Sequence, residues 1–176
     1  GRTSRRKKYV ALIAASASAL GAPPDAHLGI GGRGDPRPLA ERAASLGIGD
    51  RVRLTGARHD IPELLSAFDA FVHPAIAESF GMVIIEAMAM GRPVISTSLG
   101  IEGLDVTDGK HFLRADNAEA FSSGIRSRLD AADFRQRIAR SAPRLDDERF
   151  AEQYFAAPVH GNFVGPTARV APALAK

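Results

Sequence analysis

Two carboxylates flank the predicted start of a helix in residues 77–96, AESFGMVIIEAMAMGRPVIS. Glu78 lies in a predicted loop, and Glu86 follows eight positions later in an otherwise apolar run. The first amides of a helix have no partner within it, and with the positive end of the helix dipole they form an anion site. Gly81 would let a ligand approach that backbone closely. The arrangement suits a ligand with a phosphate between hydroxylated rings, whose hydroxyls donate to the carboxylates.

Both acids also have ordinary structural interpretations. Glu86 could pair with Arg92 or face solvent from a half-exposed helix, since a buried carboxylate needs a partner. Glu78, taken alone, is typical of a surface acid on a loop. Of the histidines, His73 and His111 are interpreted as structural or surface residues. Spacing alone therefore leaves the functional and structural interpretations open.

Predicted helices and strands alternate along the chain with short connections. Apolar runs bounded by Gly or Pro predict strands at residues 26–32, 51–56, 68–74, 93–97 and 111–115. Helices are predicted at residues 8–20, 38–46, 61–67, 80–90, 116–129 and 130–154. Asp60 and Asp116 are the expected N-caps of two of them. This alternation predicts an α/β fold, a doubly wound Rossmann-like parallel sheet, which binds ligands at the carboxyl ends of its strands.

The order of the predicted elements begins with a helix, whereas a doubly wound domain opens with a strand near the middle of its sheet. We therefore expect a sheet that lacks its first strand, or a sequence that is a piece of something longer. Residues 1–155 are expected to form one domain. Residues 156–176 are rich in Pro, Gly and Ala without periodicity, and a disordered tail is expected there.

The composition excludes several classes of protein. The 176 residues include no cysteine, which rules out disulfides and thiolate metal sites. No apolar run reaches the roughly 20 residues that cross a bilayer, and no signal peptide is recognisable, so a cytoplasmic location is expected. The net charge is +3, and only 6% of residues are aromatic. Stacking platforms are therefore scarce, and nucleic acid is not expected as a partner.

The residues around the two acids resemble the retaining glycosyltransferases of the GT-B fold, the glycosyl transferases group 1 family. Seven residues separate Glu78 from Glu86, as in the E-x7-E segment of that family, and the run "EAMAMGRPVIST" matches its continuation. The segments "GRTSRRKK", "LGIGGRGDP" and "DRVRLTGARHDIPELLSAFDAFVHP" resemble its donor loop, glycine turn and middle strands. The resemblance covers residues 1–150 and implies the C-terminal, donor-binding half of a two-domain GT-B enzyme.

Roles for individual residues follow from this resemblance. Arg2 and Lys7 would neutralise the diphosphate in place of a metal ion, so no metal and no cofactor are expected. Glu78 would hold hydroxyls of the transferred sugar, and with Arg2 and Lys7 it makes up the expected catalytic group. Glu86 would bind the ribose hydroxyls. The remaining contacts implied for the sugar, phosphate and base are Ser79, Phe80, Gly81, Met82 and Arg58.

The implied function is transfer of a sugar, with retention, from a UDP-, GDP- or ADP-sugar to a saccharide or glycolipid acceptor. Polysaccharide biosynthesis is the expected setting, with peripheral membrane contact in the full-length enzyme. In the family the acceptor binds an N-terminal domain, so this chain is expected to be inactive alone. The alternatives are a non-catalytic or degenerate nucleotide-sugar-binding module, and an epimerase or phosphorylase of the same architecture.

Overall fold

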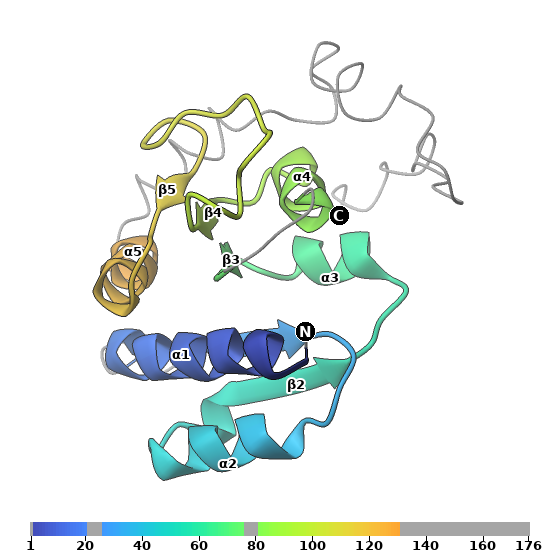
Figure 1. Ribbon diagram of the computed structural model, residues 1–176, viewed down its shortest axis with the longest axis vertical. Coiled ribbons are helices and arrows are strands. Elements are labelled where there is room, and N and C mark those ends of the chain that lie inside the picture. The colour runs from blue at the N-terminus through green and yellow to red at the C-terminus, as the bar shows by residue number, and fades with distance from the viewer. Residues whose placement is uncertain (1, 21–25, 76–80, 131–176) are drawn as a thin grey trace, which may run out of the picture.

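The computed structural model describes residues 2–20, 26–75 and 81–130 of the chain (Figure 1). Its helices are α1 (Arg2–Leu20), α2 (Arg37–Ser45), α3 (Ile61–Ser66), α4 (Met82–Ala89) and α5 (Ala118–Asp130), with a 3₁₀ turn, η1, at Gly49–Arg51. The strands are β1 (Leu28–Gly31), β2 (Val52–Gly56), β3 (Phe71–His73), β4 (Val94–Ser96) and β5 (Leu113–Arg114). Each predicted segment within these ranges forms the expected type of element. The predicted helix over 130–154 and the predicted tail lie outside the described residues.

The paired strands all run parallel, as an α/β fold requires. β1 pairs with β2, and β4 pairs with both β3 and β5. All three residues of β4 are buried, because a central parallel strand is covered on both faces. Parallel pairing brings the carboxyl ends of neighbouring strands to the same edge of each sheet, which is the edge where α/β proteins bind ligands.

A break divides the strands into two sets. Among the described residues, no ladder joins the β1–β2 pair to the β3–β4–β5 set. In a doubly wound sheet of order 3-2-1-4-5-6, the first strand lies between the second and the fourth. If β1 is the second strand of that order and β3 the fourth, the break falls at the position of the first. The parallel strands confirm the prediction of an α/β fold with a Rossmann-like sheet, and the missing first strand stays a prediction.

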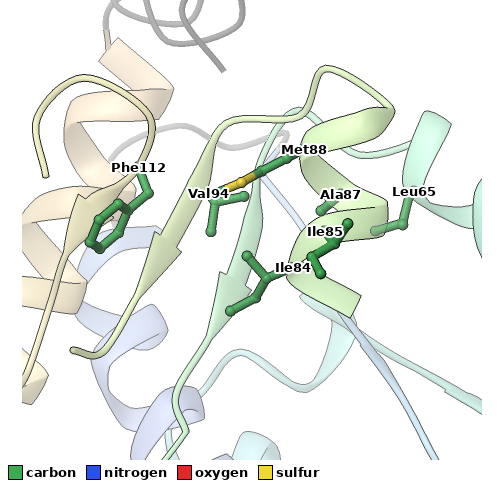
Figure 2. Packing of buried hydrophobic residues seen from close by; sticks show 7 residues of the cluster. All are labelled: Leu65, Ile84, Ile85, Ala87, Met88, Val94 and Phe112. Atoms are coloured by element: carbon green, nitrogen blue, oxygen red, sulfur yellow. The ribbon is translucent and has the colours of Figure 1, made fainter. Parts of the chain in front are cut away.

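Helix α4 supplies the centre of one apolar core (Figure 2). Its buried side chains pack against α3, β4 and the segment before β5; the cluster consists of Leu65, Ile84, Ile85, Ala87, Met88, Val94 and Phe112. Burying an aliphatic side chain of this size contributes about 1.5–3 kcal/mol. Gly91 ends the helix with a left-handed φ of 65°, and its amide donates to the carbonyl of Met88 at 2.8 Å.

Helix α1 packs against both α2 and α5, which belong to different strand sets (Figure 1). Ile13 and Leu20 join the core formed with β1, α2 and β2. Ala15 joins a third core with Ile95 of β4 and Phe121 of α5. Within the described residues, α1 therefore contributes to the cores of both strand sets and holds them together across the break.

Three sequence expectations about helix ends are corrected. Helix α1 begins at Arg2, six residues before the predicted start, because the basic segment contains good helix formers and no breaker. Asn117 caps α5: its Oδ1 accepts from the amide of Ala120 at 2.8 Å. The expected cap, Asp116, instead accepts from the amide and hydroxyl of Ser98 at 2.7 and 2.9 Å.

The third correction concerns Asp60, which occupies the N-cap position of α3 but makes no capping hydrogen bond through its side chain. Its carboxylate pairs with Arg58, whose Nε donates to Oδ1 at 2.7 Å. The Asp60 carboxylate therefore accepts from Arg58, two residues earlier, instead of from the first amides of the helix.

Candidate functional site

A cavity of about 670 Å³ opens along the break and extends to the carboxyl-terminal edge of the strands. Residues that follow three different strands line its outer part: Arg33 after β1, Arg58 after β2 and Pro74 after β3. This is the edge at which the sequence places a ligand, and the volume lies within the roughly 300–1,000 Å³ of small-molecule sites. The cavity is therefore the candidate site.

A buried polar network closes the edge where β3 and β4 end. The hydroxyl of Thr97 donates to the carbonyl of Ala75 at 2.7 Å, and the hydroxyl of Ser96 lies 3.3 Å from the carbonyl of His73. The amide of Gly100 donates to the Thr97 hydroxyl at 3.0 Å. The sequence analysis did not predict this network. The two hydroxyl residues at the end of the predicted strand "VIST" were the feature of the sequence that could have indicated it. The network holds the loop after β4 against the end of β3.

His73 lies within this network rather than on the surface. The residue is buried at 8% exposure, and its ring stacks on that of Phe71 with centroids 6.0 Å apart. It also lines the cavity. Burial and stacking fit the structural interpretation of His73, while its place in the cavity wall leaves one side of the residue at the candidate site.

The start of α4 lies against the loop that follows β4. Ile84 and Ile85 donate their amides to the carbonyl of Gly81, so the amides of Met82 and Val83 have no acceptor within the helix. A Cβ on Gly81 would come within 2.7 Å of the carbonyl oxygen of Gly100. Gly81 is thus required by close approach of the protein's own backbone. The expected close approach of a ligand stays a prediction.

Glu86 occupies a half-buried position in the middle of α4. Burial raises the pKa of its carboxyl group above 4.5. The proposed pairing with Arg92 does not occur, because that guanidinium donates to the backbone carbonyls of Met90 and Phe68 at 3.2 and 3.0 Å. No ion pair joins Glu86 to any cation in the part of the chain that the structure describes. Its neighbour Val83 lines the cavity, whereas Glu86 is not among the lining residues.

Arg58 is the predicted base-contacting residue, and it lies in the cavity wall. Its guanidinium forms a two-pronged ion pair with Asp60, which holds the pKa of that carboxyl below its usual value. The side chain of Arg58 remains 38% exposed. Its position fits a contact with a ligand at the end of β2. Such a ligand would contact a guanidinium that is already paired with Asp60.

The other predicted site residues are only partly covered by the structure. The backbones of Arg2 and Lys7 lie in the first two turns of α1, a helix where a loop was expected. Glu78, Ser79 and Phe80 lie outside the described residues. Met82 begins α4 and packs beside the core of that helix. The pairing of Glu78 with Glu86 around one helix start therefore stays a prediction.

Two kinds of feature are absent from the described ranges 2–20, 26–75 and 81–130. They contain no cluster of three or more His, Asp or Glu residues placed to hold a metal ion. None of the helices in these ranges combines the length and apolarity needed to cross a membrane.

Comparison with known proteins places the chain in a family. The profile of the family described as glycosyl transferases group 1 matches residues 1–131. Because the match covers well over half of the 176 residues, the chain belongs to this family. The family resemblance noted in the sequence is thereby confirmed.

Among curated proteins, the mannosylfructose-phosphate synthase of Agrobacterium fabrum is 35% identical over 136 residues, covering 71% of this chain and 30% of the relative. The lipopolysaccharide core biosynthesis glycosyltransferase LpsE of Rhizobium meliloti is 34% identical over 142 residues, covering 79% of this chain and 41% of the relative. The chain thus spans less than half the length of these relatives.

Solved structures share the fold of this chain. Anabaena HepE in complex with UDP matches with a TM-score of 0.69 and 27% identity, over 82% of this chain and 40% of that one. The C-terminal domain of a group 1 protein, LpcC of Francisella tularensis, matches with a TM-score of 0.70 over 83% of this chain and 78% of that one. At 20% identity the second likeness shows the fold alone. The fold is a Rossmann-like half of the GT-B architecture.

Proposed function

We propose that this chain is the donor-binding half of a retaining glycosyltransferase, which transfers a hexose from a nucleotide diphosphate sugar to a saccharide or glycolipid. The observation that carries the proposal is the geometry of α4. The amides of Met82 and Val83 have no acceptor within the helix, and Glu86 follows one turn later with no ion pair among the described residues. A half-buried carboxylate is costly without a partner, and ribose hydroxyls are donors that would offset this cost.

The chemistry assigns each charged group a task. The bond between the anomeric carbon and the β-phosphate oxygen breaks, and the acceptor oxygen bonds to that carbon on the same face. The acceptor hydroxyl loses its proton, which passes to the departing phosphate and then to solvent, and the nucleoside diphosphate is released with an additional negative charge. Arg2 and Lys7 would stabilise that charge, together with the amides of Met82 and Val83 at the start of α4. No metal ion is needed for this step, because the two cations take its place.

Donor binding should change the ionisation of Glu86. Hydroxyls donate to an ionised carboxylate more strongly than to a protonated one, so a bound ribose would lower the pKa that burial raises. The solved HepE structures contain UDP, and UDP with glucose, which makes UDP the first nucleotide to test. GDP and ADP are the alternatives.

Calorimetric titration of the chain with UDP, GDP and ADP tests donor binding. We expect one of them to bind, and Glu86→Gln to weaken that binding by about 10- to 100-fold through loss of a charge-assisted hydrogen bond. The matched control is Glu63→Gln, which changes an exposed acid in the first turn of α3. Equal affinities of the wild-type chain and Glu86→Gln would contradict the assignment.

Turnover is a separate question, because this chain spans less than half of its relatives. We propose that residues 1–176 bind the donor but transfer no sugar by themselves, since acceptor positioning and exclusion of water need the rest of the enzyme. Incubation with radiolabelled donor and candidate acceptors measures this. Efficient transfer by residues 1–176 alone would show that the acceptor site lies within them.

A further inference from the structure

The loop after β4 contacts the two residues that border the segment 76–80. On one side, the hydroxyl of Thr97 donates to the carbonyl of Ala75 at 2.7 Å. On the other side, a Cβ on Gly81 would lie 2.7 Å from the carbonyl oxygen of Gly100, so these two backbones approach each other closely. The loop therefore holds the residues before and after the segment that the family resemblance assigns to sugar binding.

Gly100 has little room to move within this loop. A Cβ on Gly100 would meet the hydroxyl of Ser96, and it would lie 3.1 Å from the ring of His73. The amide of Gly100 also donates to the Thr97 hydroxyl at 3.0 Å. Close-packed groups transmit a displacement because they have no free space to absorb it. A shift of this loop would thus be passed on to its neighbour Gly81.

Asp116, which follows β5, ties the loop from its other side. Ser98 donates its backbone amide and its hydroxyl to Oδ1 of Asp116, at 2.7 and 2.9 Å. These two hydrogen bonds hold the pKa of the Asp116 carboxyl below its usual value, so the group is ionised at neutral pH. Its Oδ2 lies 3.5 Å from Nε of Arg114. The amide of Ala115 donates to the carbonyl of Ser96 at 2.8 Å, which joins the segment after β5 to the end of β4.

We propose that Asp116 is a positioning residue of the donor site, which holds the loop after β4 against Gly81 through Ser98 and so places the first amides of α4. This inference rests on the proposed function, because those amides are the ones assigned to the leaving diphosphate. Asp116 acts through the loop and not by contact with the donor. A misplacement of about 1 Å at groups that orient a reacting ligand can cost about 100-fold in rate.

The first test follows the start of α4 in the full chain without a ligand. The amides of Ile84 and Ile85 donate to the carbonyl of Gly81 at 2.8 and 3.2 Å, so their hydrogen exchange reports the first turn of the helix. We expect Asp116→Ala to accelerate exchange of both amides at least about tenfold. Asp116→Asn retains an Oδ1 acceptor for Ser98 and should keep exchange within about twofold of that in the unaltered chain.

The second test is nucleotide affinity, measured by calorimetry with UDP, GDP and ADP as probes. For any nucleotide that the unaltered chain binds, we expect Asp116→Ala to weaken binding at least about fivefold, and Asp116→Asn by no more than about twofold. The matched control is Asn117→Ala, which removes the cap of α5 at the very next position. It should change neither the nucleotide affinity nor the exchange of the Ile84 and Ile85 amides by more than about twofold.

The two tests separate this inference from the proposed function. Unchanged exchange at Ile84 and Ile85 in Asp116→Ala would overturn the inference. Equal effects of Asp116→Ala and Asn117→Ala would also overturn it, because they would show a general loss of stability. Binding that Glu86→Gln weakens and Asp116→Ala does not would overturn this inference and leave the proposed function standing. Failure of all three nucleotides to bind the unaltered chain would overturn both.

Discussion

Glu86 places a carboxylate where the surroundings favour its neutral form. Burial raises the pKa of this group above 4.5, so between the unfolded and folded pKa values the folded state binds more protons. The free energy of unfolding contributed by Glu86 therefore falls as pH rises through that window. The proposed contact with ribose hydroxyls would account for an acid that lowers stability at neutral pH within a helix rich in Ile, Ala and Met.

Replacing this acid should separate stability from binding. Glu86→Gln is expected to raise the free energy of unfolding at pH 7 and to change it little at pH 3.5, where the carboxyl group is protonated in both states. Urea denaturation at the two pH values measures this. The exposed Glu63→Gln on α3 is the control and should show no comparable gain at pH 7. A loss of stability for Glu86→Gln at pH 7 would mean that the carboxylate has a stabilising partner.

Gly81 is constrained by a backbone neighbour, which cannot move aside as a flexible side chain can. Gly81→Ala is expected to cost about 1–3 kcal/mol, because its Cβ would come within 2.7 Å of the Gly100 carbonyl. Thermal and urea unfolding measure this cost. Gly49→Ala is the matched control, since its Cβ would meet nothing closer than 3.5 Å. Equal stability of the two variants would show that the loop after β4 can move its Gly100 carbonyl away from the new Cβ at little cost.

At the scale of elements, the turn before β5 depends on a neutral histidine. His111 Nδ1 accepts from the amide of Thr107 at 3.0 Å. Burial and the charge of Lys110 lower the pKa of His111 below 6.5, and the opposing effect of Asp105 is smaller. A lowered pKa in the folded state means that this contribution to stability is present above pH 6.5 and is lost as pH falls through the folded pKa.

We therefore expect the Thr107 amide to exchange faster when the pH falls below the pKa of His111. An NMR titration of the ring should give a midpoint below 6.5, and His111→Ala should make stability less dependent on pH between 5 and 7. His59→Ala changes an exposed histidine near α3 and serves as the control. A midpoint above 6.5 for His111 would contradict the hydrogen bond to its unprotonated nitrogen.

At the scale of the whole molecule, the break in the sheet leaves two strand sets with separate cores. Ile48 belongs to the core of β1, β2 and α2, while Phe121 belongs to the core of β4 and α5. Helix α1 packs against both sets, and no ladder connects them within the described residues. Without a shared ladder, cooperative unfolding rests on helix packing alone, which favours local opening of each set.

Truncations in opposite halves should therefore act separately. Ile48→Ala is expected to cost about 2–5 kcal/mol and Phe121→Ala about 3–5 kcal/mol. Native-state amide exchange should accelerate at least about tenfold in β1 and β2 for the first variant, and in β4 and β5 for the second. Each variant serves as the control for the other. Uniform acceleration in both strand sets would show that α1 alone makes the domain a single cooperative unit.

The sequence by itself determined the types of the elements, their order and the family. Apolar runs bounded by Gly and Pro, such as the one that forms β4, reveal elements because those residues act on the local backbone. The run from Glu78 through "EAMAMGRPVIST" identified the family because function constrains many neighbouring positions at once.

Only the tertiary structure decided which groups meet. Rotamers and competing partners decide three contacts that the sequence does not reveal. Asn117 caps α5, Arg58 pairs with Asp60, and Arg92 donates to a backbone carbonyl instead of pairing with Glu86. The position of the break and the cavity along it required the strand order, which joins residues far apart in sequence. The type of an element depends on interactions between residues that are close in sequence. Burial, pKa shifts and a shared cavity depend on contacts between residues that are far apart in sequence, so no single segment reveals them.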